Sequence, residues 1–226
     1  MTLSASIVIT SYNYARYLHI AIESALGQTT DAEVVVVDDG SSDESGQIIR
    51  GFGSDIMAIL FERNRGQAAA LNAGVRASHG DIVMFLDSDD WAAPERTERV
   101  LEFLASHPEL DMIRHNVAQV DSEGHLLLDS SYDFDSESDL RREIVQFGEA
   151  IGTNIGLAFR RSFLERVGPI PESYRTNPDT YLKVAGAIAG RVGHIDQSLA
   201  FRRIHSRQAT RRWTMDRTAA KSFLDL

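Results

Sequence analysis

The chain has 226 residues, no cysteine and a formal net charge of −10, because 33 acidic residues outnumber 23 lysines and arginines. The length suffices for one large α/β domain, and the lack of cysteine excludes disulfides and thiolate metal sites. An acidic chain without an extended basic face is a poor candidate for a nucleic-acid binder, so we expect no nucleic-acid partner.

The first half of the chain alternates between short apolar runs and segments of helical period. Strands are predicted at 6–10, 33–37, 56–61 and 82–86, and helices at 15–26, 44–50, 67–77 and 94–106. Alternation at intervals of ~25–30 residues predicts βαβ units and a mostly parallel sheet. A glycine inside a helix costs about 1 kcal/mol relative to alanine, so Gly74 indicates close packing.

The second half carries a less regular pattern. We expect a strand at 111–115, a hairpin through 117–128 that turns at 122–124, an acidic serine-rich loop at 130–139 and a helix at 140–147. A strand at 157–160, a helix at 181–189, two short strands at 191–195 and 199–204 and a terminal helix with Trp213 and Phe223 complete the chain. No repeat or linker divides it, which predicts a single domain over residues 1–226.

Hydropathy predicts a cytoplasmic protein. The apolar runs at 34–37 and 82–86 are far shorter than the roughly 20 residues of a membrane-spanning helix. The first residues enter a strand pattern without a basic region or cleavage site. Basic residues gather late, as a solvated helix face or as a phosphate-facing or membrane-facing patch: Arg202, Arg203, Arg207, Arg211 and Arg212.

A cluster of carboxylates follows the apolar run 82–86. Ligands of open α/β sheets bind outside the carboxyl ends of the strands, which is where Asp87, Asp89 and Asp90 fall. Asp87 and Asp89 are two apart and point the same way on an extended backbone, so they repel unless a cation compensates them. This Asp-x-Asp pattern fits Mg²⁺ or Mn²⁺ bound together with a substrate diphosphate. The alternative is an acidic turn in which Asp89 or Asp90 caps the helix entered at Pro94.

Two further strand ends supply polar side chains to the same edge. Tyr12 follows the first strand and offers a ring on which a base can stack. Asp39 follows the second and can accept from a base N–H or a ribose hydroxyl, whereas Asp38 is interpreted as part of a turn with Ser41 or Ser42. The three strand ends together predict a nucleotide-diphosphate site without a glycine-rich loop.

The order of the segments SYN, VVDDGSSD, NRGQAAALNAG and GDIVMFLDSDD resembles the family 2 glycosyltransferases of the GT-A fold, enzymes that use nucleotide sugars. The resemblance is close over 6–91 and weak over 110–149. Later segments resemble the family's acceptor side (GTNIGLAFRRSFLERVGPIPES), its catalytic-acid segment (NPDTYLKVAG) and its Arg-x-His element (RRIHSRQ). It implies a Rossmann-like, mixed and mostly parallel sheet flanked by helices. Residues 1–115 would be the nucleotide-sugar-binding half, and 116–226 the acceptor half with the C-terminal helix.

The resemblance also implies roles for individual residues. The nucleotide-binding set is Thr10, Tyr12, Asn13, Asp39, Asn64, Arg65, Gly66, Asn72, Asp87 and Ser88. Asp89 would ligate Mn²⁺ or Mg²⁺, with Asp87 and His205 beside it. Taken alone, a histidine at this position is more often a structural residue than a metal ligand, and only the resemblance favours the metal role of His205.

The same resemblance makes Asp179 the general base. Many relatives carry a second acid immediately before the base, where this chain has Pro178, so Glu172 is a second choice. A single base opposite the leaving group implies direct displacement with inversion.

The expected partners are a nucleotide-diphosphate sugar, with UDP as first choice, and a carbohydrate or lipid-linked acceptor selected by 121–156. Cell-surface polysaccharide or glycolipid assembly is the expected role by analogy. The competing hypothesis is a non-catalytic nucleotide-sugar binder or scaffold. The sugar, the acceptor and the oligomeric state are left open, as is peripheral contact with the inner face of a membrane.

Overall fold

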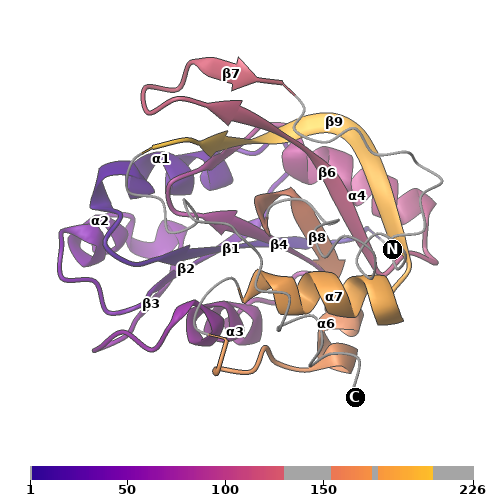
Figure 1. Cartoon of the computed structure of the whole chain (residues 1–226), viewed down its shortest axis with the longest axis horizontal. Coiled ribbons are helices and arrows are strands. Elements are labelled where there is room, and N and C mark those ends of the chain that lie inside the picture. The colour runs from indigo at the N-terminus through magenta and orange to yellow at the C-terminus, as the bar shows by residue number, and fades with distance from the viewer. Residues whose placement is uncertain (1, 130–153, 175–177, 206–226) are drawn as a thin grey trace, which may run out of the picture.

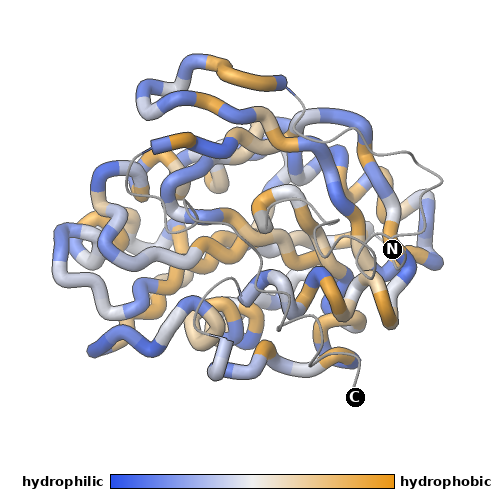
Figure 2. The backbone as a smooth tube through the Cα atoms, in the orientation of Figure 1, coloured by the Kyte–Doolittle hydropathy of each residue, from blue (hydrophilic) through white to orange (hydrophobic). Residues whose placement is uncertain are grey.

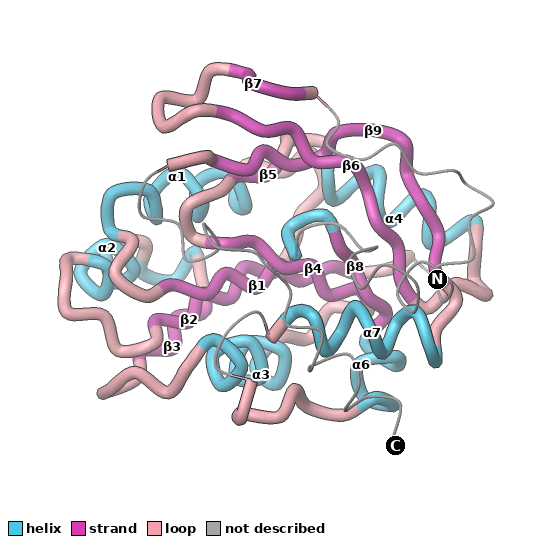
Figure 3. Tube along the Cα trace, in the orientation of Figure 1, coloured by secondary structure: helices cyan, strands magenta, loops and turns pink. Residues whose placement is uncertain are grey.

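The structure, a computed structural model, describes residues 2–129, 154–174 and 178–205. In these ranges the strands form one sheet of order β3-β2-β1-β4-β8-β6-β9-β5, with β7 paired to β6 (Figure 1). Helices cover both faces of the sheet, α1, α2 and α4 on one and α3, α6 and α7 on the other (Figure 3). The predicted α/β class is confirmed.

The first half forms the parallel part of the sheet. Its strands are β1 (Ala5–Ser11), β2 (Glu33–Asp38), β3 (Met57–Leu60) and β4 (Ile82–Asp87), all parallel to their neighbours among these four. They are joined by α1 (Ala15–Leu26), by α2 (Ser45–Gly51) with the short η1 (Gly53–Asp55), and by α3 (Gln67–Ala77). The βαβ units expected from the sequence are present.

The second half turns the sheet into a mixed one. Its elements are β5 (Trp91–Ala92), α4 (Arg96–Ser106), β6 (Met112–Val120), β7 (Leu126–Leu128), η2 (Asn154–Gly156), β8 (Leu157–Arg160), α6 (Arg161–Val167), α7 (Asp179–Ala189) and β9 (Val192–Arg203). Strand β8 lies antiparallel between β4 and β6, and β9 runs parallel to β6 and antiparallel to β5.

Several predicted boundaries differ from the structure. The strand predicted at 111–115 and the first arm of the hairpin form one strand, β6, and the two strands predicted at 191–195 and 199–204 form β9. The pairing of β6 with β9 shifts register around Asn116, the position at which the predicted strands were divided. Strand β5 and helix α6 were not predicted. The loop at 130–139, the helix at 140–147 and the terminal helix lie outside the described residues.

The core has two layers because the central strands are buried on both faces, as the continuous apolar runs of a parallel sheet indicate. Ile7 and Ile9 pack toward α1 and α4, and Val8 packs toward α3. Figure 2 shows the apolar stretch along the central strands. A Cβ added to Gly74 on α3 would lie 2.3 Å from Cγ1 of Val8, so the predicted close packing at Gly74 is confirmed.

The helices of the described ranges are short. The longest, α1, has 12 residues, which is about 18 Å at 1.5 Å per residue. Among the described residues, no helix combines the length and apolar character needed to cross a membrane.

Candidate functional site

The loops that follow β1, β2 and β4 meet at one edge of the sheet. Thr10 lies opposite Val37 on one side and Asp87 on the other, and Ser11 lies opposite Asp38. The three strands therefore end at the same level. The structure brings together the strand ends from which the sequence predicted a ligand site.

Asp39 is buried at this edge and is held by the loop after β3. Its carboxylate accepts hydrogen bonds from the backbone N–H groups of Arg65 at 2.7 Å and Gly66 at 2.9 Å, and from the side-chain amide of Asn64 at 2.9 Å. Burial raises the pKa of Asp39, and the two N–H groups oppose that shift. A carboxylate accepts about four hydrogen bonds, and the described residues supply three of them to Asp39. Asp39 thus positions residues 64–66, and its predicted contact with a nucleoside stays a prediction.

The loops after β1 and β2 interlock through Asn13. This residue has a positive φ of 60°, its side-chain oxygen accepts from the N–H of Ser42 at 2.8 Å, and its own N–H donates to Oγ of Ser41 at 2.9 Å. Asp38 in turn accepts from the N–H and the hydroxyl of Ser41, as expected for a turn residue. The neighbouring Tyr12 remains 45% exposed, so its ring is available for stacking at a firmly held loop.

The acidic loop after β4 contains one carboxylate with a structural role. Asp90 is buried and accepts from the backbone N–H of Arg203 at 2.8 Å. Burial raises the pKa of Asp90 well above its usual range, and the carboxylates of Asp89 and Asp87 raise it further. Helix α4 begins without a side-chain cap, so neither Asp89 nor Asp90 caps it, contrary to the alternative considered from the sequence.

Asp89 has His205 as its neighbour, although 116 positions separate them along the chain. Nε2 of His205 lies 3.0 Å from Oδ2 of Asp89, and both side chains are largely buried. The imidazole packs against the rings of Tyr17 at 5.0 Å and Tyr14 at 5.9 Å between centroids. His205, two residues after β9, therefore lies against the acidic loop, and its predicted place beside a metal stays a prediction.

Arg203 fixes this end of β9, a role that the sequence did not reveal. Its guanidinium lies 4.7 Å from the ring centroids of both Tyr17 and Trp91. It donates to the carbonyl of Asp89 at 3.1 Å and to the carbonyl of Ser122 at 2.7 Å. Together with the Asp90 hydrogen bond, these contacts determine where His205 stands.

A divalent cation fits this donor set only with help from a substrate. The described residues contain no cluster of three or more histidine or acidic side chains arranged for a metal. Asp89 and His205 offer two adjacent side chains that could bind a cation. Asp87 is the last residue of β4, two positions before Asp89. Mg²⁺ and Mn²⁺ are commonly held by one or two carboxylates plus substrate phosphates, so a two-residue site that a diphosphate completes is chemically consistent.

The two candidate bases are both paired. Asp179 is the first residue of α7, and its carboxylate contacts the ammonium of Lys183 one turn later, with each side chain 14% exposed. Glu172 is exposed and lies 3.3 Å from Nη2 of Arg65. Within the described residues, Asp179 is held by its own helix, and its role as a base stays a prediction.

Two predicted nucleotide-binding residues have structural contacts that the sequence did not suggest. The buried amide of Asn72 donates to the carbonyl of Ile170 at 2.7 Å and accepts from its N–H at 2.9 Å. The guanidinium of Arg65 lies 4.8 Å from the ring centroid of Phe61. Asn72 therefore joins α3 to the segment after α6, and its part in nucleotide binding stays a prediction. Ser88 is buried in the loop after β4.

Sequence reasoning also missed a fully buried cation behind this edge. Nε of Arg96 donates to Nε2 of His115 at 3.0 Å, and Nη2 donates to the carbonyls of Phe85 at 3.1 Å and Ile155 at 2.6 Å. Burial lowers the pKa of Arg96 to about 9. Burial, followed by the charge of Arg96, lowers the pKa of His115 to about 3, so this histidine is neutral. The sequence could have indicated this burial, because Arg96 lies at helical spacing from Val100 and Leu104 on the buried face of α4.

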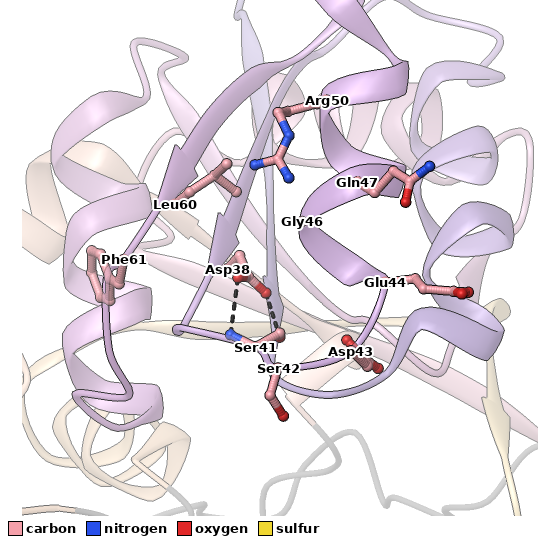
Figure 4. A pocket seen from close by; sticks show the side chains of 10 residues that line it. All are labelled: Asp38, Ser41, Ser42, Asp43, Glu44, Gly46, Gln47, Arg50, Leu60 and Phe61. Atoms are coloured by element: carbon pink, nitrogen blue, oxygen red, sulfur yellow. Dashed lines mark hydrogen bonds between the residues drawn. The ribbon is translucent and has the colours of Figure 1, made fainter.

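A cavity of about 450 Å³ lies beside the predicted site, between the start of α2 and the end of β3 (Figure 4). Its lining residues are Asp38, Ser41, Ser42, Asp43, Glu44, Gly46, Gln47, Arg50, Leu60 and Phe61. None of the residues predicted to bind nucleotide or metal lines it. The cavity is therefore adjacent to that set rather than part of it.

Comparison with known proteins identifies the class. The family model described as glycosyl transferase family 2 matches residues 6–168. An uncharacterised glycosyltransferase of Nostoc sp. is 36% identical over 216 residues, which cover 88% of this chain and 64% of that protein. The succinoglycan biosynthesis protein ExoU of Rhizobium meliloti is 38% identical over 120 residues, covering 51% of this chain and 34% of ExoU. The chain belongs to the family 2 glycosyltransferases.

A solved structure supports the fold. The crystal structure of S. aureus TarS residues 1–349 in complex with UDP-GlcNAc matches with a TM-score of 0.75 and 20% identity, covering 94% of this chain and 62% of that one. The expected GT-A fold is confirmed by this likeness. The chain spans between about a third and two thirds of the length of the relatives named here.

Proposed function

We propose that this protein transfers a sugar from a nucleotide-diphosphate sugar, with UDP as the nucleotide, to a hydroxyl of a carbohydrate or lipid-linked acceptor. The observation that carries the proposal is the pairing of His205 with Asp89 at the edge where Tyr12 stands exposed. This edge offers a stacking surface and a charged site for a diphosphate. The complex of TarS with UDP-GlcNAc supports the choice of donor.

The first loops of the chain would bind the nucleoside. The ring of Tyr12 stacks on the base, and its loop is held in place by the hydrogen bonds of Asn13. Asp39 keeps residues 64–66 beside the donor and offers its remaining acceptor site to a base N–H or a ribose hydroxyl. These groups are in position before a ligand arrives, which lowers the entropic cost of binding.

Metal dependence is part of the proposal. Asp89 would hold Mn²⁺ or Mg²⁺, with His205 and Asp87 beside it, and the diphosphate would complete the coordination. The bound cation would offset negative charge on the leaving diphosphate. Arg203 orients this site through the carbonyl of Asp89.

The chemical step would be a direct displacement with inversion. The acceptor oxygen forms a bond to the anomeric carbon while the bond from that carbon to the diphosphate oxygen breaks, and the electron pair leaves with the diphosphate. The acceptor proton passes to the carboxylate of Asp179, with Glu172 as the second choice. General-base assistance of this kind is worth about 10²–10⁴ in rate.

We further propose that the reaction serves cell-surface polysaccharide or glycolipid assembly and takes place in the cytoplasm, at the inner membrane face when the acceptor is lipid-linked. The succinoglycan biosynthesis protein among the relatives supports the first part. The acceptor would be selected in the stretch 121–156.

One observation favours a second candidate, a nucleotide-sugar binder that does not catalyse transfer. The carboxylate of Asp179 already contacts the ammonium of Lys183, which would compete with an acceptor hydroxyl for the same oxygens. Turnover separates the two candidates. An enzyme loses transfer or donor hydrolysis in Asp179→Asn while still binding nucleotide, whereas a binder has no turnover to lose.

Calorimetric titration with UDP, GDP and dTDP, with and without Mn²⁺, tests the donor site. We expect the wild type to bind UDP in a metal-dependent manner and Asp89→Ala to bind it at least ~10-fold more weakly, since a charged group lost from a binding site costs more than 1.4 kcal/mol. Asp55→Ala is the matched control, because it removes an exposed carboxylate just before β3, away from the strand ends. Absence of nucleotide binding in the wild type would refute the proposal.

A further inference from the structure

The segment 168–174, between α6 and α7, contains neither helix nor strand. It begins at Gly168, which has a positive φ of 76°, and it carries Glu172, the second candidate for the general base. A segment without regular structure must find partners for its buried backbone groups in turns, in side chains or in water. The side chains that bind its backbone therefore determine where Glu172 lies.

Asn72 on α3 binds the backbone of this segment. Its Nδ2 donates to the carbonyl of Ile170 at 2.7 Å, and its Oδ1 accepts from the N–H of the same residue at 2.9 Å. Asn72 is 7% exposed and Ile170 is 3% exposed, so water has little access to either hydrogen bond. An amide that binds both backbone groups of one residue, as a neighbouring strand does, fixes the orientation of that residue as well as its position.

Helix α7 holds the same segment from the other side. The hydroxyl of Tyr181 donates to the carbonyl of Val167, at the end of α6, at 3.2 Å. The rings of Tyr181 and Tyr174 lie 6.0 Å apart between centroids. Tyr181 follows Asp179, the first candidate base, by two residues in the first turn of α7. The segment is therefore held between α3 and the end of α7 that carries Asp179.

Glu172 extends from this segment to the loop that Asp39 holds. Its Oε1 lies 3.3 Å from Nη2 of Arg65, and both side chains are about half exposed. An exposed ion pair of this kind contributes little to holding two segments together. The buried hydrogen bonds of Asn72 are the stronger restraint, so they determine how Glu172 lies relative to residues 64–66.

We propose that Asn72 is a positioning residue for the transfer reaction, because it sets the segment 168–174 and the start of α7 against residues 64–66. This inference rests on the proposed function and deepens it. It assigns Asn72 to proton removal, through Glu172 or Asp179, instead of to the nucleotide contact expected from the sequence. Displacing a reacting group by about 1 Å costs ~10²-fold in rate. A loosened segment should therefore lower turnover and leave nucleotide affinity unchanged.

Hydrogen exchange followed by mass spectrometry tests the positioning without any ligand. In Asn72→Ala the backbone amides of 168–174 should exchange at least ~10-fold faster than in the wild type, because two buried hydrogen bonds are lost. Asn72→Ser should behave alike and is the second variant if Asn72→Ala does not fold, since a buried serine in a helix can bond to the preceding turn. Unchanged exchange at 168–174 would overturn the proposal.

Ser78→Ala is the matched control at the other end of α3. The buried hydroxyl of Ser78 donates to the carbonyl of Val75 at 3.0 Å and accepts from Nη2 of Arg161 at 3.0 Å. The variant therefore also removes two hydrogen bonds from α3, but away from the segment 168–174. Its exchange at 168–174 should equal that of the wild type.

Binding and turnover test the consequence for the reaction. In calorimetry with Mn²⁺, folded Asn72→Ala should bind UDP within ~2-fold of the wild type. Hydrolysis of UDP-glucose, UDP-galactose and UDP-N-acetylglucosamine identifies the preferred donor, for which kcat should fall at least ~10-fold at an unchanged KM. Ser78→Ala should change neither constant.

The outcomes separate this inference from the proposed function. A ~10-fold loss of UDP affinity in Asn72→Ala would assign Asn72 to the nucleotide site and contradict the positioning role, as would an unchanged kcat. A wild type that neither binds UDP nor hydrolyses any of the three donors would count against the proposed function. Hydrogen exchange would still decide whether Asn72 holds the segment.

Discussion

Two buried polar centres lie on this sheet, and they carry opposite charges and use different kinds of partner. Asp39, at the end of β2, is an anion whose partners are N–H donors of a single loop. Arg96, on α4, is a cation whose partners are carbonyls of β4 and η2 and the neutral ring of His115. Within the described residues, neither forms an ion pair with an oppositely charged side chain.

The difference lies in access. The Asp39 centre sits at the carboxyl edge, where a ligand can reach the loop it holds, so a change there should alter both stability and ligand binding. The Arg96 centre is sealed between elements and should affect stability alone. Burial by itself therefore does not mark a functional residue in this fold; the position of the residue relative to the strand ends does.

The largest expected effect is that of Arg96→Ala. It leaves the carbonyls of Phe85 and Ile155 without their donor and opens a cavity, so the free energy of unfolding should fall by about 4 kcal/mol in urea titrations. Arg99→Ala on the same helix is the control: its exposed guanidinium pairs with Glu102 at 3.1 Å, and its loss should cost less than about 1 kcal/mol. Weaker nucleotide binding by folded Arg96→Ala protein would contradict the expectation that the Arg96 centre affects stability alone.

Asp39→Ala should rank second. It removes the acceptor for the N–H groups of Arg65 and Gly66, which should lower the free energy of unfolding by about 2–3 kcal/mol. Because residues 64–66 would then be free to move, nucleotide affinity should also fall at least ~10-fold in calorimetry. Lower stability with unchanged affinity would show that this centre, too, is only structural.

His115 should make the protein acid-sensitive. Its pKa falls from an ordinary 6.5 to about 3 in the folded state, so the unfolded chain binds the proton first as the pH drops. The contribution of neutral His115 to the free energy of unfolding is complete above pH 6.5 and is lost as the pH falls toward 3. Between pH 7 and pH 5 the loss amounts to about 2 kcal/mol. His115→Gln keeps a donor and an acceptor and should unfold in urea with a shallower dependence on pH. Equal slopes would indicate that the histidine does not stay neutral.

Arg65→Ala should have the smallest effect. The hydrogen bond to Asp39 comes from the backbone of Arg65, which alanine retains, and the exposed guanidinium contacts the exposed Glu172 and the ring of Phe61. Stability should change by less than about 0.5 kcal/mol. Arg65→Pro removes the N–H and should cost about 1–3 kcal/mol, so the two variants separate the backbone from the side chain by thermal unfolding.

The parts of the molecule that follow from local pattern were predictable from the sequence. The strands ending at Ser11, Asp38 and Asp87 and the contact at Gly74 follow from apolar runs and from the properties of glycine. The confirmed GT-A fold rests on the order of motifs in this same half.

The parts set by remote partners were not predictable. Strand β8 lies between β4 and β6 because of pairing that no local pattern encodes. Arg96 finds acceptors on four other elements, β4, β6, β8 and η2, and Asn72 binds a residue 98 positions away. The Asp39 motif itself was visible, but its partners in the loop after β3 were not. The local sequence pattern located this edge of the sheet. Tertiary contacts determine which polar side chains at the edge are already hydrogen-bonded within the protein.

Strand β6 has one more consequence. Strand β7 closes the first described range and pairs with Gln119, whereas β8 lies at the start of the second range and pairs with Arg114, so both ranges are joined to β6 at positions five residues apart. Five residues of a strand span about 16 Å. Strand β6 therefore ties the two described ranges together by backbone hydrogen bonds, and the order β4-β8-β6-β9 follows from pairing among the described strands alone.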